Sequence, residues 1–107
     1  RQLLIERDGS LVQFVPFNKK AWHAGVSSFK GRENCNEFSI GIELEGTDEN
    51  AYTDDQYRAL IDITKELMLV FQDIKKDNIV GHSDIAPGRK TDPGKSFNWH
   101  YYLSNLA

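Results

Sequence analysis

One amphipathic stretch constrains the fold of this chain more than any other feature. Residues 52–74, YTDDQYRALIDITKELMLVFQDI, repeat apolar side chains at intervals of three and four, the spacing of one face of an α-helix. Thr53 and Gln56 have the spacing of a capping box, and the two aspartates between them complement the positive end of the helix dipole. We therefore predict one long helix whose apolar face packs against another layer. The predicted face consists of Tyr57, Leu60, Ile61, Thr64, Leu67, Met68 and Phe71.

The runs around this helix are short and rich in β-forming residues. LLIE and LVQFV flank RDGS, which predicts a β-hairpin centred on an Asp-Gly turn. Residues 37–46, EFSIGIELEG, alternate apolar with small or polar side chains and predict a central strand, in which Gly41 indicates close approach of another backbone or a ligand. Residues 78–81 predict a short buried strand, and residues 98–106 predict a short helix or turn. We expect an α+β fold, with a small mixed β-sheet packed against one long helix, in a single domain spanning residues 1–107.

The composition excludes several classes of protein. Of the 107 residues, 39% are hydrophobic and 27% are charged, which is typical of a globular domain, and no apolar run approaches the ~20 residues of a membrane span. A net charge of −3 argues against a nucleic-acid partner. We expect a monomer with neither nucleic-acid binding nor membrane insertion. The single cysteine, Cys35, excludes an internal disulfide, is compatible with a reducing compartment and is interpreted as a small buried hydrophobe.

The loop GHSDIAPGRKTDPG, residues 81–94, holds the residues best suited to chemistry. His82 follows a short apolar run, and Asp92 lies further along the loop between a threonine and a proline. Imidazole nitrogen and carboxylate oxygen are common ligands of catalytic Zn²⁺, which normally has three protein ligands and an open position for water. Two residues do not define such a site, and a capped turn with a hydrogen-bonded histidine explains them equally well. The residues alone leave both interpretations open.

Charged side chains near this loop and on a predicted strand could complete a zinc site. Arg89 and Lys90 precede Asp92, where a lysine could stabilise an oxyanion and an arginine could bind a substrate carboxylate, although a solvated pair of charges is the alternative. Glu43 and Glu45 are two apart on a predicted strand and therefore share one face. One of them could act as a general base, whereas an edge strand with a polar face is the alternative.

Three further residues are weaker candidates. AWHAG places Trp22 and His23 in a long irregular segment, where Trp22 could stack on a sugar ring and His23 could bind a metal or move a proton. A tryptophan buried under a loop is the alternative. His100, within FNWHYY, is interpreted as a packing or surface residue rather than a ligand.

Three motifs taken together resemble one family. WHAG, SIGIELEG and GHSDIAPGRKTDPG, in this order, are similar to the motifs of the zinc-dependent N-acetylmuramoyl-L-alanine amidases of the AmpD type, and the resemblance covers almost the whole chain. It implies an amidase and peptidoglycan-recognition-like fold, Zn²⁺ as cofactor and a 1,6-anhydro-muropeptide as substrate. It also implies hydrolysis of the amide between the muramyl lactyl group and L-alanine, in cytoplasmic cell-wall recycling.

The resemblance assigns roles by motif position. His82 and Asp92 would be zinc ligands, and Glu43 would be the general base. Lys90 would stabilise the tetrahedral intermediate. The residues that would bind substrate are Trp22, His23 and Arg89.

The chain departs from the family pattern at its beginning. The third zinc ligand of the family is a histidine after an early strand, in a VHN-like context, and residues 1–20 contain no histidine. A small residue and a histidine are usual where Arg1 and Gln2 stand. Because the sequence also begins inside a strand-like run, we expect an N-terminally truncated domain whose third ligand lies before residue 1. The alternative is a non-catalytic module that binds peptidoglycan fragments through an incomplete metal site.

Overall fold

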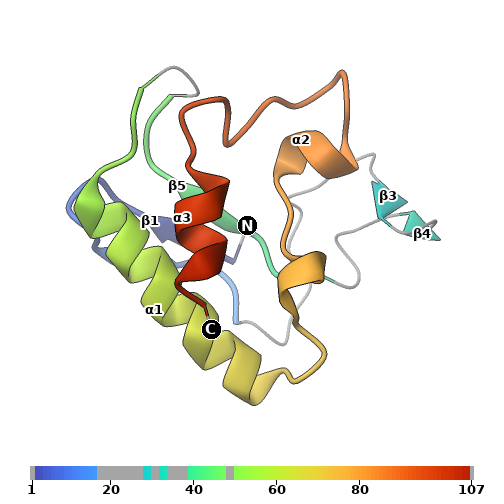
Figure 1. The fold of residues 1–107 in the computed structure, drawn as a ribbon, viewed down its shortest axis with the longest axis horizontal. Coiled ribbons are helices and arrows are strands. Elements are labelled where there is room, and N and C mark those ends of the chain that lie inside the picture. The colour runs from blue at the N-terminus through green and yellow to red at the C-terminus, as the bar shows by residue number, and fades with distance from the viewer. Residues whose placement is uncertain (1, 17–27, 30–31, 34–38, 48–49, 107) are drawn as a thin grey trace.

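The computed structural model describes residues 2–16, 28–29, 32–33, 39–47 and 50–106. Within these residues, helices pack against one face of a small mixed β-sheet (Figure 1). The α+β class predicted from the sequence is confirmed.

Three short strands form the sheet, in the order β2-β1-β5. β1 (Leu3–Ile5) pairs antiparallel with β2 (Leu11–Gln13) and parallel with β5 (Ile42–Leu44). Two shorter strands, β3 (Ser28–Phe29) and β4 (Arg32–Glu33), form a separate antiparallel pair. The larger sheet is therefore mixed, as predicted.

The predicted hairpin joins β1 to β2. The Glu6 N–H donates to the Ser10 carbonyl (2.9 Å), and Gly9, with φ of 87°, supplies the left-handed backbone that the turn requires. The Asp8 carboxylate accepts the Ser10 N–H (2.9 Å), and this hydrogen bond lowers the pKa of Asp8. The Asp-Gly turn is therefore fixed by local contacts, which explains why it could be predicted.

The strand predicted over residues 37–46 is shorter than expected and is not central. Of its described residues, only Ile42–Leu44 form a strand, and β1 is the middle strand among those described. The Gly41 carbonyl, just before β5, accepts the N–H groups of Gln2 (2.9 Å) and Leu3 (3.2 Å). The close backbone approach predicted at Gly41 is confirmed, and it fixes the start of β5 on β1.

The prediction of a buried strand over residues 78–81 is wrong. The 3₁₀-helix η2 (Lys76–Asn78) occupies its start, and no described residue after it in this stretch belongs to a strand. The Asn78 N–H donates to the Lys75 carbonyl (2.9 Å), so a turn uses the donor that a strand ladder would need. Val80 is 38% exposed, although its apolar character suggested burial.

The long helix agrees with its prediction. α1 (Asp54–Val70) begins after Thr53, whose hydroxyl accepts the Gln56 N–H (3.1 Å) while the Gln56 side chain accepts the Thr53 N–H (3.0 Å). This reciprocal pair is the predicted capping box, and it satisfies two donors that the helix itself leaves free. The buried residues of α1 are Gln56, Leu60, Ile61, Thr64 and Leu67.

The core lies between the sheet and two helices. α3 (Trp99–Ser104), predicted as a short helix or turn, lies beside α1, and both lie in front of the sheet in Figure 1. Leu3 and Ile5 point from β1 into this layer because residues two apart share one face of a strand. The helical and loop residues of the core are Tyr52, Leu60, Ile61, Phe97, Tyr102 and Leu106.

One buried hydrogen bond joins the two helices. The hydroxyl groups of Thr64 and Tyr102 lie 2.7 Å apart, and Thr64 also donates to the Leu60 carbonyl (2.6 Å). Burial raises the pKa of the Tyr102 phenol, and the hydrogen bond with Thr64 opposes part of this effect.

Tyr102→Phe should make stability less sensitive to alkaline pH. Because the folded protein raises the Tyr102 pKa, the neutral phenol stabilises the fold below the ordinary value of about 10, and this stabilisation is lost as pH rises through the folded-state pKa. In the variant, the free energy of unfolding should no longer fall with pH through this group. At neutral pH it should be lower by about 1 kcal/mol, because the hydrogen bond with Thr64 is lost. Urea unfolding between pH 8 and 11 measures both effects, with exposed Tyr101→Phe as the matched control. An equally steep alkaline slope in the Tyr102 variant would contradict the assignment.

Candidate functional site

The loop that carries the predicted ligands starts as a single helical turn. α2 (His82–Ile85) replaces the irregular start that the sequence predicted for this segment. The Asp84 carboxylate accepts the Gly81 N–H (2.8 Å), and the Ala86 N–H donates to the His82 carbonyl (3.0 Å). His82 is therefore the first residue of a hydrogen-bonded turn, which limits its backbone freedom.

The chain then reverses and returns to this turn. The Ala86 carbonyl accepts the N–H groups of Arg89 (3.2 Å) and Lys90 (3.0 Å), and Gly88 supplies a positive φ of 80°. The Ser83 N–H donates to the Asp92 carbonyl (3.0 Å). The backbone of Asp92 is thus bonded to α2, next to His82.

The two predicted zinc ligands are brought together. His82 Nδ1 lies 3.4 Å from Asp92 Oδ2, and the two side chains are 17% and 51% exposed. Good hydrogen bonds between nitrogen and oxygen are roughly 2.7–3.2 Å long, so this contact is long for one. Nitrogen and oxygen ligands of one tetrahedral Zn²⁺, each about 2.1 Å from the ion, lie roughly 3.4 Å apart. The pair is therefore spaced as two ligands of a single ion would be.

Among the described residues, no group of three or more His, Cys, Asp or Glu side chains is placed to hold a metal ion. Trp22, His23 and Cys35 lie outside the described part of the chain. His100 lies on α3 with an exposed side chain, which favours the surface alternative over packing.

The two strand glutamates have different surroundings. Glu43 lies within β5, opposite Leu4 of β1, and is exposed. Glu45 follows β5, and its carboxylate accepts the Arg7 N–H (2.8 Å) beside the hairpin turn. Glu45 thus contacts the hairpin, and Glu43 is the candidate base on the family resemblance.

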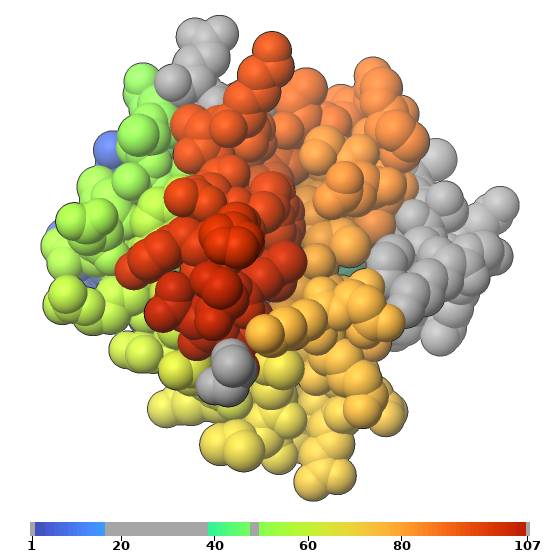
Figure 2. All heavy atoms as spheres, in the orientation of Figure 1, coloured from blue at the N-terminus to red at the C-terminus, as the bar shows by residue number. Residues whose placement is uncertain are grey.

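Arg89 and Lys90 are exposed, and their backbone N–H groups belong to the turn after α2. Guanidinium and ammonium groups of this kind bind anionic ligands such as carboxylates. In Figure 2 the orange segment around α2 lies next to the red C-terminal segment.

An aromatic cluster under the loop was not recognised from the sequence. The ring of Phe97 contacts the rings of Tyr52, Tyr57, Trp99 and Tyr102 at centroid distances of 4.8–5.9 Å. The Tyr52 hydroxyl also donates to the Pro93 carbonyl (2.8 Å), one residue after Asp92. The density of aromatic residues in FNWHYY was the available signal, but Tyr52 lies too far away in the sequence for its contact to be inferred.

Gly81 is the point where the two arms of the loop meet. A Cβ atom at this position would lie 2.8 Å from Pro93 Cδ and 3.2 Å from Trp99 Cζ2. The first distance is shorter than real Cβ contacts, and Pro93 belongs to a rigid ring. Any side chain at position 81 therefore forces a shift at Pro93, the residue next to Asp92.

Gly81→Ala should weaken zinc binding by about 10-fold or more, because displacing the supports of metal ligands typically costs 10–100-fold in affinity. It should also destabilise the fold by about 1–3 kcal/mol through overpacking. Competition with a zinc chelator and thermal unfolding measure the two effects. Gly88→Ala is the matched control, since a Cβ there meets no atom within 4 Å although its positive φ adds strain. Equal zinc affinity in both variants would show that the Gly81 contact does not set the spacing of the pair.

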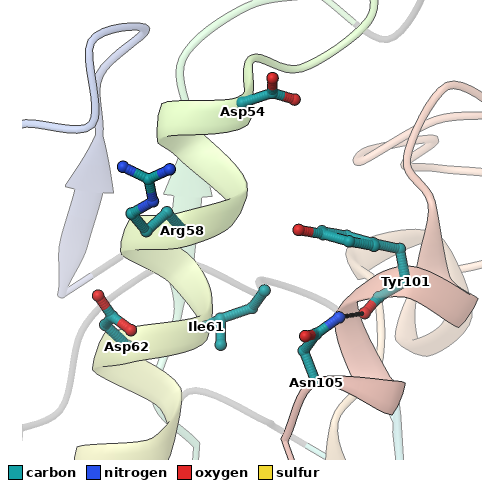
Figure 3. Close-up of a pocket in the computed structure, with 6 residues that line it drawn as sticks. All are labelled: Asp54, Arg58, Ile61, Asp62, Tyr101 and Asn105. Carbon is teal, nitrogen blue, oxygen red and sulfur yellow. Dashed lines mark hydrogen bonds between the residues drawn. The ribbon is translucent and has the colours of Figure 1, made fainter.

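A surface hollow of about 440 Å³ lies between α1 and α3, away from this pair (Figure 3). Its lining residues are Asp54, Arg58, Ile61, Asp62, Tyr101 and Asn105. None of the residues predicted to act in catalysis or binding lines it. We therefore place the candidate site at His82 and Asp92, where ligand atoms converge.

Known proteins resemble this chain over most of its length. Residues 1–95 match the family model described as N-acetylmuramoyl-L-alanine amidase. The 1,6-anhydro-N-acetylmuramyl-L-alanine amidase AmpD of Escherichia coli (strain K12) is 64% identical over 96 residues, which cover 90% of this chain and 52% of that protein. The chain therefore spans about half the length of the curated relatives it matches.

Several solved structures are also similar to this chain. A crystal structure of a Se-Met AmpD derivative has a TM-score of 0.95 at 57% identity and covers 99% of this chain and 59% of that one. Another is the E. coli amidase AmiD in complex with the substrate anhydro-N-acetylmuramic acid-L-Ala-D-gamma-Glu-L-Lys. Its TM-score is 0.88 at 33% identity, and the match covers 98% of this chain and 48% of AmiD.

Proposed function

Because the chain belongs to the N-acetylmuramoyl-L-alanine amidase family, we propose that it hydrolyses the amide bond between the lactyl group of an N-acetylmuramoyl sugar and L-alanine of a stem peptide. We assign it a 1,6-anhydro-muropeptide substrate, because its E. coli relative is named for this class and AmiD forms its complex with an anhydro-muropeptide. The spacing of His82 and Asp92 is the observation that carries the proposal.

The donor atoms of this pair fit zinc. A neutral imidazole nitrogen and a carboxylate oxygen are both common zinc ligands, and their separation of 3.4 Å suits one tetrahedral ion. When bound, zinc would supply Lewis acidity, which polarises a carbonyl and lowers the pKa of water to about 7. His82 and Asp92 would hold the ion, with a third histidine as the remaining ligand that the family resemblance predicts.

Glu43 and Lys90 complete the reaction. The Glu43 carboxylate accepts a proton from the attacking water and passes it to the departing nitrogen, so that the amide C–N bond breaks to give a lactyl carboxylate and a free L-alanine amine. The Lys90 ammonium group offsets the negative charge that develops on the carbonyl oxygen. Both side chains are exposed, so a substrate can reach them.

The remaining residues would bind the substrate. Arg89 is suited to the carboxylates of the stem peptide because a guanidinium binds a carboxylate through two parallel hydrogen bonds. Lys95, also exposed and three residues after Asp92, adds positive charge to the same segment. Trp22 and His23 are assigned to the substrate groove on the family resemblance alone.

The cellular role follows from the substrate. We propose that the protein acts as a monomer in cytoplasmic cell-wall recycling, where anhydro-muropeptides are degraded. The described residues contain no helix that combines the length and the apolar character required of a membrane span.

Hydrolysis by the full-length protein tests the proposal. Incubation with a 1,6-anhydro-muropeptide should release the free stem peptide and the anhydro-sugar, a chelator should stop the reaction, and added zinc should restore it. Separation of the products by liquid chromatography and mass spectrometry measures the result. Bound zinc and bound muropeptide with an intact amide would instead support the non-catalytic binding module.

A further inference from the structure

Two glutamine side chains are fully buried although glutamine is usually exposed. Gln2 and Gln56 each have 0% exposure, and they are among the largest fully buried side chains of the described residues. A buried amide is costly unless its donors and acceptor are hydrogen-bonded. Every buried side-chain nitrogen and oxygen in the described residues has a partner. The bonds of these two amides therefore indicate what the fold uses them for.

Gln2 holds the chain just before β5. Its Oε1 accepts the Gly41 N–H (2.7 Å), and its Nε2 donates to the Ser39 carbonyl (3.2 Å). Its own N–H donates to the Gly41 carbonyl (2.9 Å). The residue that precedes β1 thus fixes the three residues before β5, 39–41.

Gln56 holds the chain just after β5. Its Nε2 donates to the carbonyls of Glu45 (2.8 Å) and Ile5 (3.2 Å), which lie at the ends of β5 and β1. Its Oε1 accepts the Thr53 N–H (3.0 Å) and a guanidinium N–H of Arg7 (3.3 Å). The first turn of α1 is thereby bonded to both parallel strands at one point.

The strand between these two amides needs such support. β5 is three residues long and lies at the end of the described three-stranded order, so it has few ladder hydrogen bonds of its own. A register shift of one residue would turn Glu43 to the opposite face of the sheet. We propose that Gln2 and Gln56 are positioning residues that clamp the two ends of β5 and hold Glu43 where the reaction needs it. The catalytic part of this inference rests on the proposed function, in which Glu43 is the base.

The substitution Gln56→Glu tests the clamp after β5 with almost no change in shape. A carboxylate keeps acceptors for Thr53 and Arg7 but loses the amide donors. The carbonyls of Glu45 and Ile5 would then face a negative charge instead of an N–H group. Amide hydrogen exchange of the Glu45 N–H, which donates to the Ile5 carbonyl (2.8 Å), should accelerate about tenfold. The Tyr102 N–H in α3 should not change. Gln2→Met, which removes the Oε1 acceptor of the Gly41 N–H (2.7 Å), should likewise accelerate exchange of the Gly41 N–H.

The same variants test the link to catalysis. Misplacing a catalytic group by about 1 Å can lower the reaction rate roughly 100-fold. We therefore expect kcat to fall between tenfold and 100-fold while KM and zinc content stay unchanged. In a Glu43→Gln background, Gln56→Glu should have no further effect on residual kcat, because it acts through the base that is already lost. Exposed Gln72→Glu makes the identical chemical change just beyond α1 and should leave exchange and kcat unaltered. If Gln56→Glu does not fold, Gln56→Met removes the same donors without adding charge.

The outcomes separate this inference from the proposed function. Unchanged exchange at Glu45 and Gly41 would overturn the clamps. An equal loss of kcat with and without Glu43 would show a general structural role and would overturn the positioning role. If the unmodified protein hydrolyses no muropeptide, the proposed function fails, and the exchange result still decides whether the clamps exist.

Discussion

Glu43→Gln should lower kcat by about 10²–10⁴-fold while zinc content stays the same. The amide of glutamine has the shape of the carboxylate but cannot take a proton from water. The substitution should not disturb the fold, since Glu43 is exposed on β5 and its strand is held at both ends by Gln2 and Gln56. Steady-state kinetics with a 1,6-anhydro-muropeptide and metal analysis of the purified variant measure the two quantities.

Glu45→Gln is the matched control. Its carboxylate accepts the Arg7 N–H, and an amide oxygen can accept the same bond, so activity should remain within a few-fold of the unmodified protein. If Glu45→Gln abolishes turnover and Glu43→Gln retains it, the base is Glu45. If neither substitution affects turnover, His23 becomes the next candidate.

Asp92→Ala should reduce zinc affinity by more than about 100-fold and abolish turnover with it, because even the residues that support metal ligands contribute 10–100-fold. The loop should remain folded, since the Ser83 N–H binds the backbone carbonyl of Asp92 and the Tyr52 hydroxyl binds that of Pro93. Equilibrium dialysis measures zinc affinity, and circular dichroism checks the fold.

Asp62→Ala, an exposed substitution on α1, serves as the control for this experiment. It makes the same chemical change remote from the loop and should bind zinc normally. Full zinc binding by Asp92→Ala would instead support the structural interpretation, in which His82 and Asp92 only stabilise a turn.

Features set by neighbours in the sequence could be predicted. The capping box of α1 involves Thr53 and Gln56, and its buried face follows from the spacing of apolar residues. The hairpin turn likewise depends on contacts among residues 6–10, including the Asp8 side chain and the positive φ of Gly9. The pairing of His82 with Asp92 was expected from the family resemblance, whereas the residues alone left a capped turn as an equal interpretation.

Features that depend on contacts between residues far apart in the sequence could not be predicted. Residues 78–81 have the composition of a strand, but composition does not say whether a neighbouring strand is present to pair with them. Gln56 was recognised only as a cap, although its amide also binds Ile5, 51 positions away in the sequence. Tyr52 and Gly81 act through contacts with Pro93 and Trp99, which depend on how the loop packs on the aromatic cluster.

The most direct test of the zinc centre is to locate the metal in crystals of the full-length protein by anomalous diffraction at the zinc edge. We expect a single strong peak about 2.0–2.2 Å from both His82 Nδ1 and Asp92 Oδ2, with a further histidine as the third protein ligand. A zinc-saturated crystal with no peak at this pair, or with its peak at other residues, would contradict the assignment of residues 81–94 as part of a zinc amidase centre.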